Sequence, residues 1–348
     1  MKILQYKQNA VMAKSRAFYG KRLTQKDYES LLNCSCVQEI ASYLRNTQLY
    51  SDILEKLSTT DISAGYLEFL ITKNEALIFS KLCRYEMAFG QEIYNYFVVI
   101  SEIRQILSAV RRILFGETEA FENPKNRIYS GSTDIDMIAL SATQNMDDVL
   151  RILASSKYRK VIENCVNNSE NEYLYYECAF VNFFHEYEYE LVKKCSGKKS
   201  ELLRLLSEKA DTEFIDKLYR AKKYFSSASD RAMINIAPVH LTRLTKNEIK
   251  ELLSAENEKS MLEILMNTPY KKYALRIEKD ISAEQSVAKI NYEKYRHLLR
   301  FSTEPDTVMF CYMFLAENEV SNLIHIIEGV KYKMNSSVIK DMLIGAGD

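Results

Sequence analysis

Short motifs of three kinds recur along this chain in the same order and at nearly regular intervals. The first is found twice, as LTQKDYESLL at residues 23–32 and as LTKNEIKELL at residues 244–253. In both copies an acidic residue stands three positions after a threonine, which is the capping-box pattern of a helix start. Apolar residues then follow at helical spacing. Repetition on this scale constrains the fold strongly, because each copy must build a similar structural unit.

The second motif ends in a tyrosine and occurs three times. It reads IASYLRNTQLY at 40–50, VLRILASSKY at 149–158 and LEILMNTPY at 262–270. The repeated tyrosines are Tyr50, Tyr158 and Tyr270, and the two intervals between them are nearly equal. Each interval is also close to half of the offset between the two copies of the first motif, so both observations indicate one period. The middle copy of the first motif, near residues 135–141, is degenerate.

The third motif has the form Glu-apolar-x-amide/acid-x-apolar and begins at Glu102, Glu213 and Glu319. A basic residue follows each copy within about three helical turns. Two interpretations of the three glutamates remain open. In the first, each glutamate caps a turn or pairs with a following Arg or Lys. In the second, the three glutamates line a central opening that holds a partner helix, and both roles can coexist.

The motifs predict three similar helical repeats of nearly equal length, with boundaries at 1–120, 121–231 and 232–348. Each repeat has a short capped helix, a second short helix that ends near the tyrosine, and a long helical hairpin. The predicted hairpins are 67–114, 172–225 and 283–334, and the predicted linkers are 115–124 and 226–238. Three large, equal repeats favour pseudo-threefold packing about an axis.

Composition supports an all-α fold class and excludes several functions. Only 13 of the 348 residues are Gly or Pro, which predicts long helices with few breaks. The chain has 47 basic and 47 acidic residues, and this balance argues against nucleic-acid binding and against a polybasic membrane anchor. The longest stretch without Asp, Glu, Lys or Arg is eleven residues, 232–242, whereas a spanning helix needs roughly 20.

Motifs of known catalytic chemistry are absent from the sequence. None of the nine glycines stands in a P-loop, a GxGxxG or a GxSxG pattern. The four histidines and seven cysteines are scattered, without the spacing of a zinc site or a disulfide framework. We therefore expect no catalytic site, no cofactor and no metal site.

Three segments carry a family resemblance. The opening residues 9–24, followed by Tyr28, resemble the start of the C-type subunits of bacterial and archaeal V/A-type ATPases (ATP synthases), whose counterparts in the eukaryotic vacuolar enzyme are the d-type subunits. Residues 262–270 resemble the family's L-x-x-L-x-x-T-x-Y element. The most specific segment is 317–331, ENEVSNLIHIIEGVK, which is similar to the family's terminal K-E-x-E-V-x-N-L-x-x-I-x-x-G-K.

The resemblance implies a funnel-shaped, non-catalytic subunit on the cytoplasmic face of the membrane. It would lie between the central shaft of a rotary motor and its membrane ring of ion-carrying subunits, and would meet the membrane only through these partners. The polar residues that we predict to line a socket for the shaft are Glu102, Arg111, Glu213, Arg220, Glu319, Asn322 and Lys331. Two other interpretations remain: a helical adaptor of another assembly, and an enzyme whose site has no sequence signature.

Overall fold

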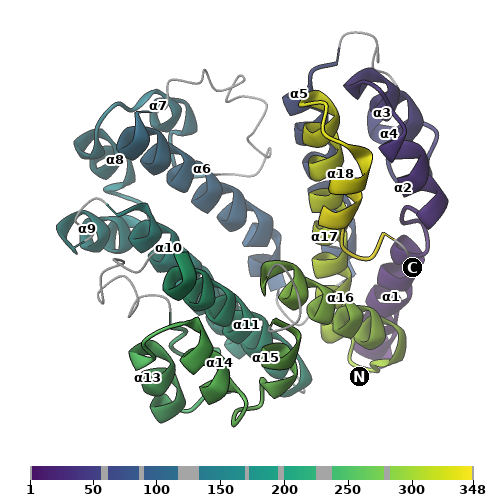
Figure 1. The fold of residues 1–348 in the computed structure, drawn as a ribbon. Coiled ribbons are helices and arrows are strands. Elements are labelled where there is room, and N and C mark those ends of the chain that lie inside the picture. Colours follow the sequence, from purple (N-terminus) through teal and green to yellow (C-terminus); the bar gives the residue numbers. More distant parts are fainter. Residues whose placement is uncertain are drawn as a thin grey trace. The chain divides into compact units, whose positions relative to one another are not determined.

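The computed structural model describes residues 2–55, 62–85, 90–116, 133–168, 172–194, 200–224, 237–277 and 283–346. Every regular element within these ranges is a helix (Figure 1), which confirms the predicted all-α fold class. No helix in the same ranges is long and apolar enough to cross a membrane. Most of both predicted linkers lies outside the described residues.

The chain divides into two compact units. Unit 1 combines the two ends of the chain, residues 1–90 and 288–348, whereas unit 2 contains residues 91–287. The three predicted repeats are divisions of the sequence, and their boundaries and pseudo-threefold arrangement remain predictions.

Unit 1 is built around one long helix near the end of the chain, α17. The helices of the unit are α1 (Lys2–Tyr19), α2 (Gln25–Leu32), α3 (Val37–Leu44), α4 (Ser51–Leu54), α5 (Ala64–Cys83), most of α16 (Ala283–Phe301), α17 (Pro305–Lys331) and α18 (Ser336–Met342). Helices α1 and α5 pack along α17, and α2, α3 and α18 also contact it. The N-terminal helices therefore cover the last long helix of the chain.

The sequence of α17 explains its central place. Pro305 occupies the first turn, where its missing N–H costs no hydrogen bond. The helix is buried on all sides from Thr307 to Leu315, as expected of a core helix that is apolar all round. Near its end, Gly329 allows α18 to pack closely, because a Cβ there would lie 2.5 Å from Cδ1 of Ile339.

Unit 2 contains the middle of the chain. Its elements are the 3₁₀ helix η1 (Gly90–Asn95), α6 (Tyr96–Phe115), α7 (Met137–Ala142), α8 (Met146–Leu153), α9 (Arg159–Asn168), α10 (Tyr173–Lys194), α11 (Ser200–Tyr224), α13 (Lys246–Ser254), α14 (Glu258–Leu265) and α15 (Lys271–Ile277). Helix α10 packs against α6, α9 and α11, and α14 packs against α11. The contact between α10 and α11 agrees with the second predicted hairpin, whereas α5 and α6 of the first belong to different units.

Three groups of short helices correspond to the repeated motifs. We call them the first cap (α2–α4), the second cap (α7–α9) and the third cap (α13–α15). The predicted capping boxes are present: Thr24 and Asp27 cap α2, and Thr245 and Glu248 cap α13. The degenerate middle copy begins α7 with Asp136 as N-cap instead. The first cap packs on α17, the second on α6 and the third on α11.

Candidate functional site

Each cap contains one of the repeated tyrosines in a fully buried position. Tyr50, Tyr158 and Tyr270 are at most 2% exposed. In the second and third caps, a hydroxyl two residues earlier, on Ser156 or Thr268, donates to the end of the preceding helix and accepts the tyrosine N–H. These local bonds turn the chain sharply, so that the tyrosine lies beneath the cap.

In the second cap, the buried tyrosine donates to a carboxylate on α6. The hydroxyl of Tyr158 lies 2.7 Å from Oε2 of Glu102, and Oγ1 of Thr133 lies 2.7 Å from Oε1. Lys157 adds an ion pair, with Nζ 2.8 Å from Oε2. Glu102, which is 4% exposed, therefore has two hydrogen-bond donors and a compensating positive charge.

The third cap repeats this arrangement with an aspartate on α11. Asp211 is fully buried and accepts hydrogen bonds from the hydroxyls of Tyr270 and Thr242. The backbone N–H of Arg243 is a third donor, 2.7 Å from Oδ2. Burial raises the pKa of Asp211, and the three hydrogen bonds act in the opposite direction.

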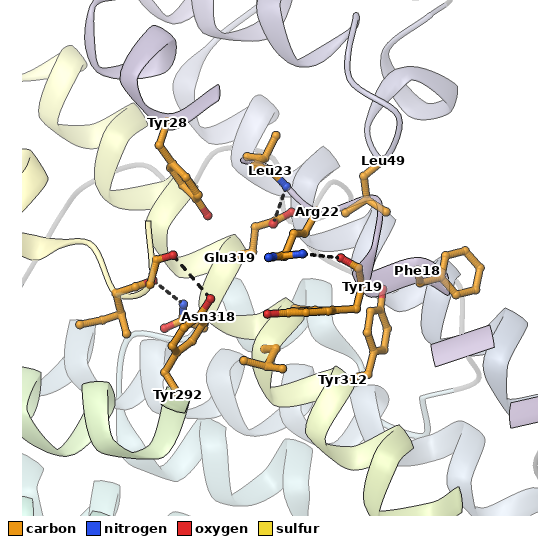
Figure 2. A pocket seen from close by; sticks show the side chains of 14 residues that line it. Phe18, Tyr19, Arg22, Leu23, Tyr28, Leu49, Tyr292, Tyr312, Asn318 and Glu319 are labelled. Atoms are coloured by element: carbon orange, nitrogen blue, oxygen red, sulfur yellow. Dashed lines mark hydrogen bonds between the residues drawn. The ribbon is translucent and has the colours of Figure 1, made fainter. Parts of the chain in front are cut away.

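In the first cap, a buried tyrosine likewise donates to a carboxylate, here on α17. The tyrosine and the carboxylate come from opposite ends of the chain. The hydroxyl of Tyr50 lies 2.9 Å from Oε1 of Glu319, and the backbone N–H of Leu23 lies 3.0 Å from Oε2 (Figure 2 shows the second of these bonds). Among the described side chains, no Lys, Arg or His nitrogen lies within 4.0 Å of this carboxylate. Burial raises the pKa of Glu319 to about 7, against the effect of both hydrogen bonds.

We call these three arrangements latches. A buried carboxylate on a long helix binds the buried tyrosine of a cap together with a donor from the segment just before the cap. An unpaired buried hydroxyl or N–H would be costly, so each latch holds its cap in a single register on its helix. The hydrogen bonds use the carboxylate oxygens to fasten helices together.

Comparison with protein-family models identifies the family of this chain. Residues 11–342 match the model of the family described as ATP synthase (C/AC39) subunit, which covers nearly the whole chain. The chain belongs to this family. It is therefore a subunit of a rotary ATPase, and the resemblance seen in its motifs is confirmed. No curated protein sequence matches it.

Three of the predicted socket residues of this C/AC39 subunit are buried in its own packing. Glu102 and Glu319 are the latch carboxylates on α6 and α17. Asn322, which is 2% exposed, holds the C-terminal segment, since its amide exchanges hydrogen bonds with the N–H and the carbonyl of Ile344. All three side chains are thus bonded within unit 1 or unit 2.

The other four predicted socket residues lie nearer the surface. Arg111, Arg220 and Lys331 are exposed, and Glu213 is about one-third exposed, at 36%. Desolvation raises the pKa of Glu213, but an ion pair with Lys209, 3.1 Å away, helps to hold it well below the usual range of a carboxyl group. The sequence motif assigned Glu213 to the place of Glu102 and Glu319, but the latch residue on α11 is Asp211, two positions earlier.

The spacing of the latch donors could have identified Asp211. Thr133 follows Glu102 by 31 residues, and Thr242 follows Asp211 by the same 31 residues. The separations to the tyrosines, 56 and 59 residues, are also similar. Thr133 and Thr242 were missed because a single threonine in a loop carries no periodic signal.

A second buried polar cluster in the C/AC39 subunit joins α10 to α11 and α6. His185, 3% exposed, lies 3.1 Å from Glu188 and 3.2 Å from Glu213. Tyr96 donates to Glu188 at 2.7 Å. Burial alone would lower the pKa of His185, but the two carboxylates raise it above its ordinary value. The described part of the chain contains no group of three or more His, Cys, Asp or Glu arranged to hold a metal ion.

Proposed function

We propose that this C/AC39 subunit mechanically couples the central shaft of a rotary ATPase to its membrane ring of ion-carrying subunits, without catalysing a reaction itself. Membership of the family over residues 11–342 is the observation that carries the proposal. The latches support it, because buried carboxylates that fasten helices suit a subunit that transmits force. On this proposal the subunit lies peripherally on the cytoplasmic face and meets the membrane only through its partners.

The energy to be transmitted requires a broad contact. Moving one charge across 100 mV is worth roughly 2.3 kcal/mol, so a full turn that moves many ions involves on the order of tens of kcal/mol. A single exposed ion pair contributes only about 0 to 1 kcal/mol. The shaft must therefore be held over an interface of about 1,200–2,000 Å² or more, with charged side chains contributing to its orientation.

Two of the predicted socket residues occupy equivalent places on the latch helices. Arg111 follows the latch carboxylate Glu102 on α6 by nine positions, and Arg220 follows Asp211 on α11 by nine. Nine residues are two and a half helical turns, which places each arginine on the opposite face of its helix from the latch. Both arginines therefore point away from their caps, where a partner could reach them.

Charge reversal of these arginines tests the shaft-binding surface. We expect Arg111→Glu combined with Arg220→Glu to weaken binding to the purified shaft subunits about tenfold, since each contact is worth up to about 1 kcal/mol. Circular dichroism should show unchanged helix content. The matched control is Arg151→Glu on α8, where the side chain is 77% exposed and should not affect binding. Glu102 and Glu319 are unsuitable for this test, because reversing a buried latch carboxylate would impair folding.

Two outcomes would contradict different parts of the proposal. Unchanged shaft binding of the double variant would exclude the arginine faces of α6 and α11 from the interface. Purification of the native complex without a shaft or a membrane ring would contradict the coupling function itself and favour a helical adaptor of another assembly.

A further inference from the structure

The Glu319 latch differs from the other two in how its charge is compensated. Glu102 has two hydrogen-bond donors and the ammonium group of Lys157, and Asp211 has three donors. Glu319 is 7% exposed and has two donors, with no ion-pair partner within 4.0 Å among the described residues. Burial with so few partners favours the protonated form of this carboxylate.

A small cavity adjoins this carboxylate within unit 1. Its volume is about 30 Å³, and Glu319, Tyr19, Arg22 and Tyr28 line it. Figure 2 shows these four side chains directed toward the same space. A polar space of this size can hold a water molecule. The cavity therefore offers a neutral carboxyl group a place to direct its O–H.

Tyr19 supplies a further polar atom beside this space. Its side chain is 8% exposed, and its hydroxyl has no hydrogen-bond partner within the described part of the chain. A buried hydroxyl without a hydrogen-bond partner is unusual and indicates that a water molecule or another polar group can bind it. A proton on Glu319 can thus be satisfied through a water molecule that also binds the hydroxyl of Tyr19.

The Glu319 latch joins the N-terminal part of the chain to the C-terminal helix α17. Leu23 and Tyr50 belong to the N-terminal segment, and Glu319 lies 296 and 269 residues away from them on α17. The C-terminal segment forms another wall of the cavity, because Asn318 and Asn322 both donate to the carbonyl of Ile344. No short peptide segment connects the first cap to α17. Weaker interactions at Glu319 would therefore loosen the cap from this helix.

We propose that Glu319 is a proton-binding site and that its protonation determines how firmly the first cap is held on α17. With the proton bound, the neutral carboxyl group accepts from Tyr50 and Leu23 and donates into the cavity. When the proton is lost to solvent, a negative charge remains buried with two hydrogen-bond donors and no ion-pair partner within 4.0 Å among the described residues, and the cap loosens.

Titratable and charged groups from each element packed around Glu319 lie near this carboxylate. They are Tyr19 on α1, Arg22 before α2, Asp27 and Tyr28 on α2, Tyr50 before α4, Glu75 on α5, Tyr292 on α16 and Tyr312 on α17. Burial raises the pKa of Tyr28 and Tyr50 well above 10, so both stay neutral, and the pKa of Asp27 is lowered. Arginine keeps its positive charge throughout this range. Because the pKa of Glu319 is raised to about 7, the stabilising effect of its protonation is lost as the pH rises through 7.

Hydrogen exchange of the full-length chain tests this proposal, with the second and third caps as internal controls. Protection factors, which correct for the intrinsic effect of pH, would be compared at pH 6 and pH 8 for residues 23–54, 137–168 and 246–277. We expect protection of the first cap to fall about tenfold between these pH values, and the other two caps to change less. In Glu319→Gln, whose side chain is always neutral, the first cap should keep similar protection at both values.

A second variant keeps the proposal testable if Glu319→Gln does not fold. Tyr50→Phe removes a hydrogen-bond donor that favours the ionised form of Glu319. The titration midpoint of the Glu319 carboxyl group, followed by the NMR shift of its carboxyl carbon, should therefore move to higher pH. Three results would overturn the proposal: an equal pH response of all three caps, a pH response that persists in Glu319→Gln, or a Glu319 midpoint near the ordinary value for glutamate.

Discussion

The latches of unit 2 and the latch of unit 1 join a cap to a long helix with the same pair of groups, a tyrosine hydroxyl and a carboxylate. In unit 2 the partners are close in sequence, 56 and 59 residues apart, and each carboxylate has a third partner. In unit 1 the partners are 269 residues apart, and Glu319 has two donors among the residues that the structure describes. The comparison shows that hydrogen-bond geometry can be repeated while charge compensation differs, so similar latches can respond differently to pH.

The largest expected loss of unfolding free energy follows from removing the Asp211 carboxylate, which accepts three hydrogen bonds. Asp211→Ala would leave the hydroxyls of Tyr270 and Thr242 and the N–H of Arg243 buried without an acceptor. We expect unit 2 to lose about 3–5 kcal/mol of unfolding free energy. Denaturant titration monitored by circular dichroism would measure this loss. A cost below about 1 kcal/mol would show that the third cap does not depend on its latch.

A smaller effect is expected at the wall of the cavity in unit 1. Gly345 has a φ of +71°, and a Cβ there would lie 2.1 Å from Cζ of Tyr292. Gly345→Ala should therefore destabilise unit 1 by about 1–3 kcal/mol, through strain and displacement of the tyrosine ring. Gly116→Ala is the control, because its φ is also positive, at +63°, but no atom of the described residues lies within 4 Å of the added Cβ. Equal losses of melting temperature in the two variants would show that close packing against Tyr292 is unimportant.

The smallest effects should come from removing single hydroxyls, and they sharpen the comparison between the latches. Tyr158→Phe, Tyr270→Phe and Tyr50→Phe should each cost about 1–2 kcal/mol of unfolding free energy. For Tyr50→Phe the cost should be greater at pH 8 than at pH 6, because a hydrogen bond to an ionised carboxylate is stronger than one to a neutral acid. Chemical denaturation at both pH values would measure the costs. Identical pH dependence of all three variants would contradict the distinction drawn for Glu319.

Much of the fold could be predicted because it depends on local interactions. The capping boxes at Thr24 and Thr245 involve residues three positions apart, and the structure confirms both. The repeated tyrosines were identified from a recurring motif and its spacing, and all three are buried. The shortage of Gly and Pro similarly predicted the all-helical fold class.

The latch carboxylates were only partly identified. Glu102 and Glu319 were selected from a repeated pattern, but the pattern selected Glu213 on α11, where Asp211 is the latch residue. Both residues lie on one helix, and two positions on a helix correspond to a rotation of about 200°. An alignment of acidic residues does not show which one faces the cap, because that depends on how α11 packs against α14.

The sequence by itself determined the helices, their N-terminal capping boxes and the repeated order of the motifs. Hydrogen bonds and apolar contacts within a few residues specify these features. Only the tertiary structure decided that the first cap belongs with the last long helix. That partnership depends on burying Tyr50 against a carboxylate 269 residues away, and no local interaction selects it. The tertiary structure also decided which carboxylates were left with few partners, because desolvation depends on everything packed around a group.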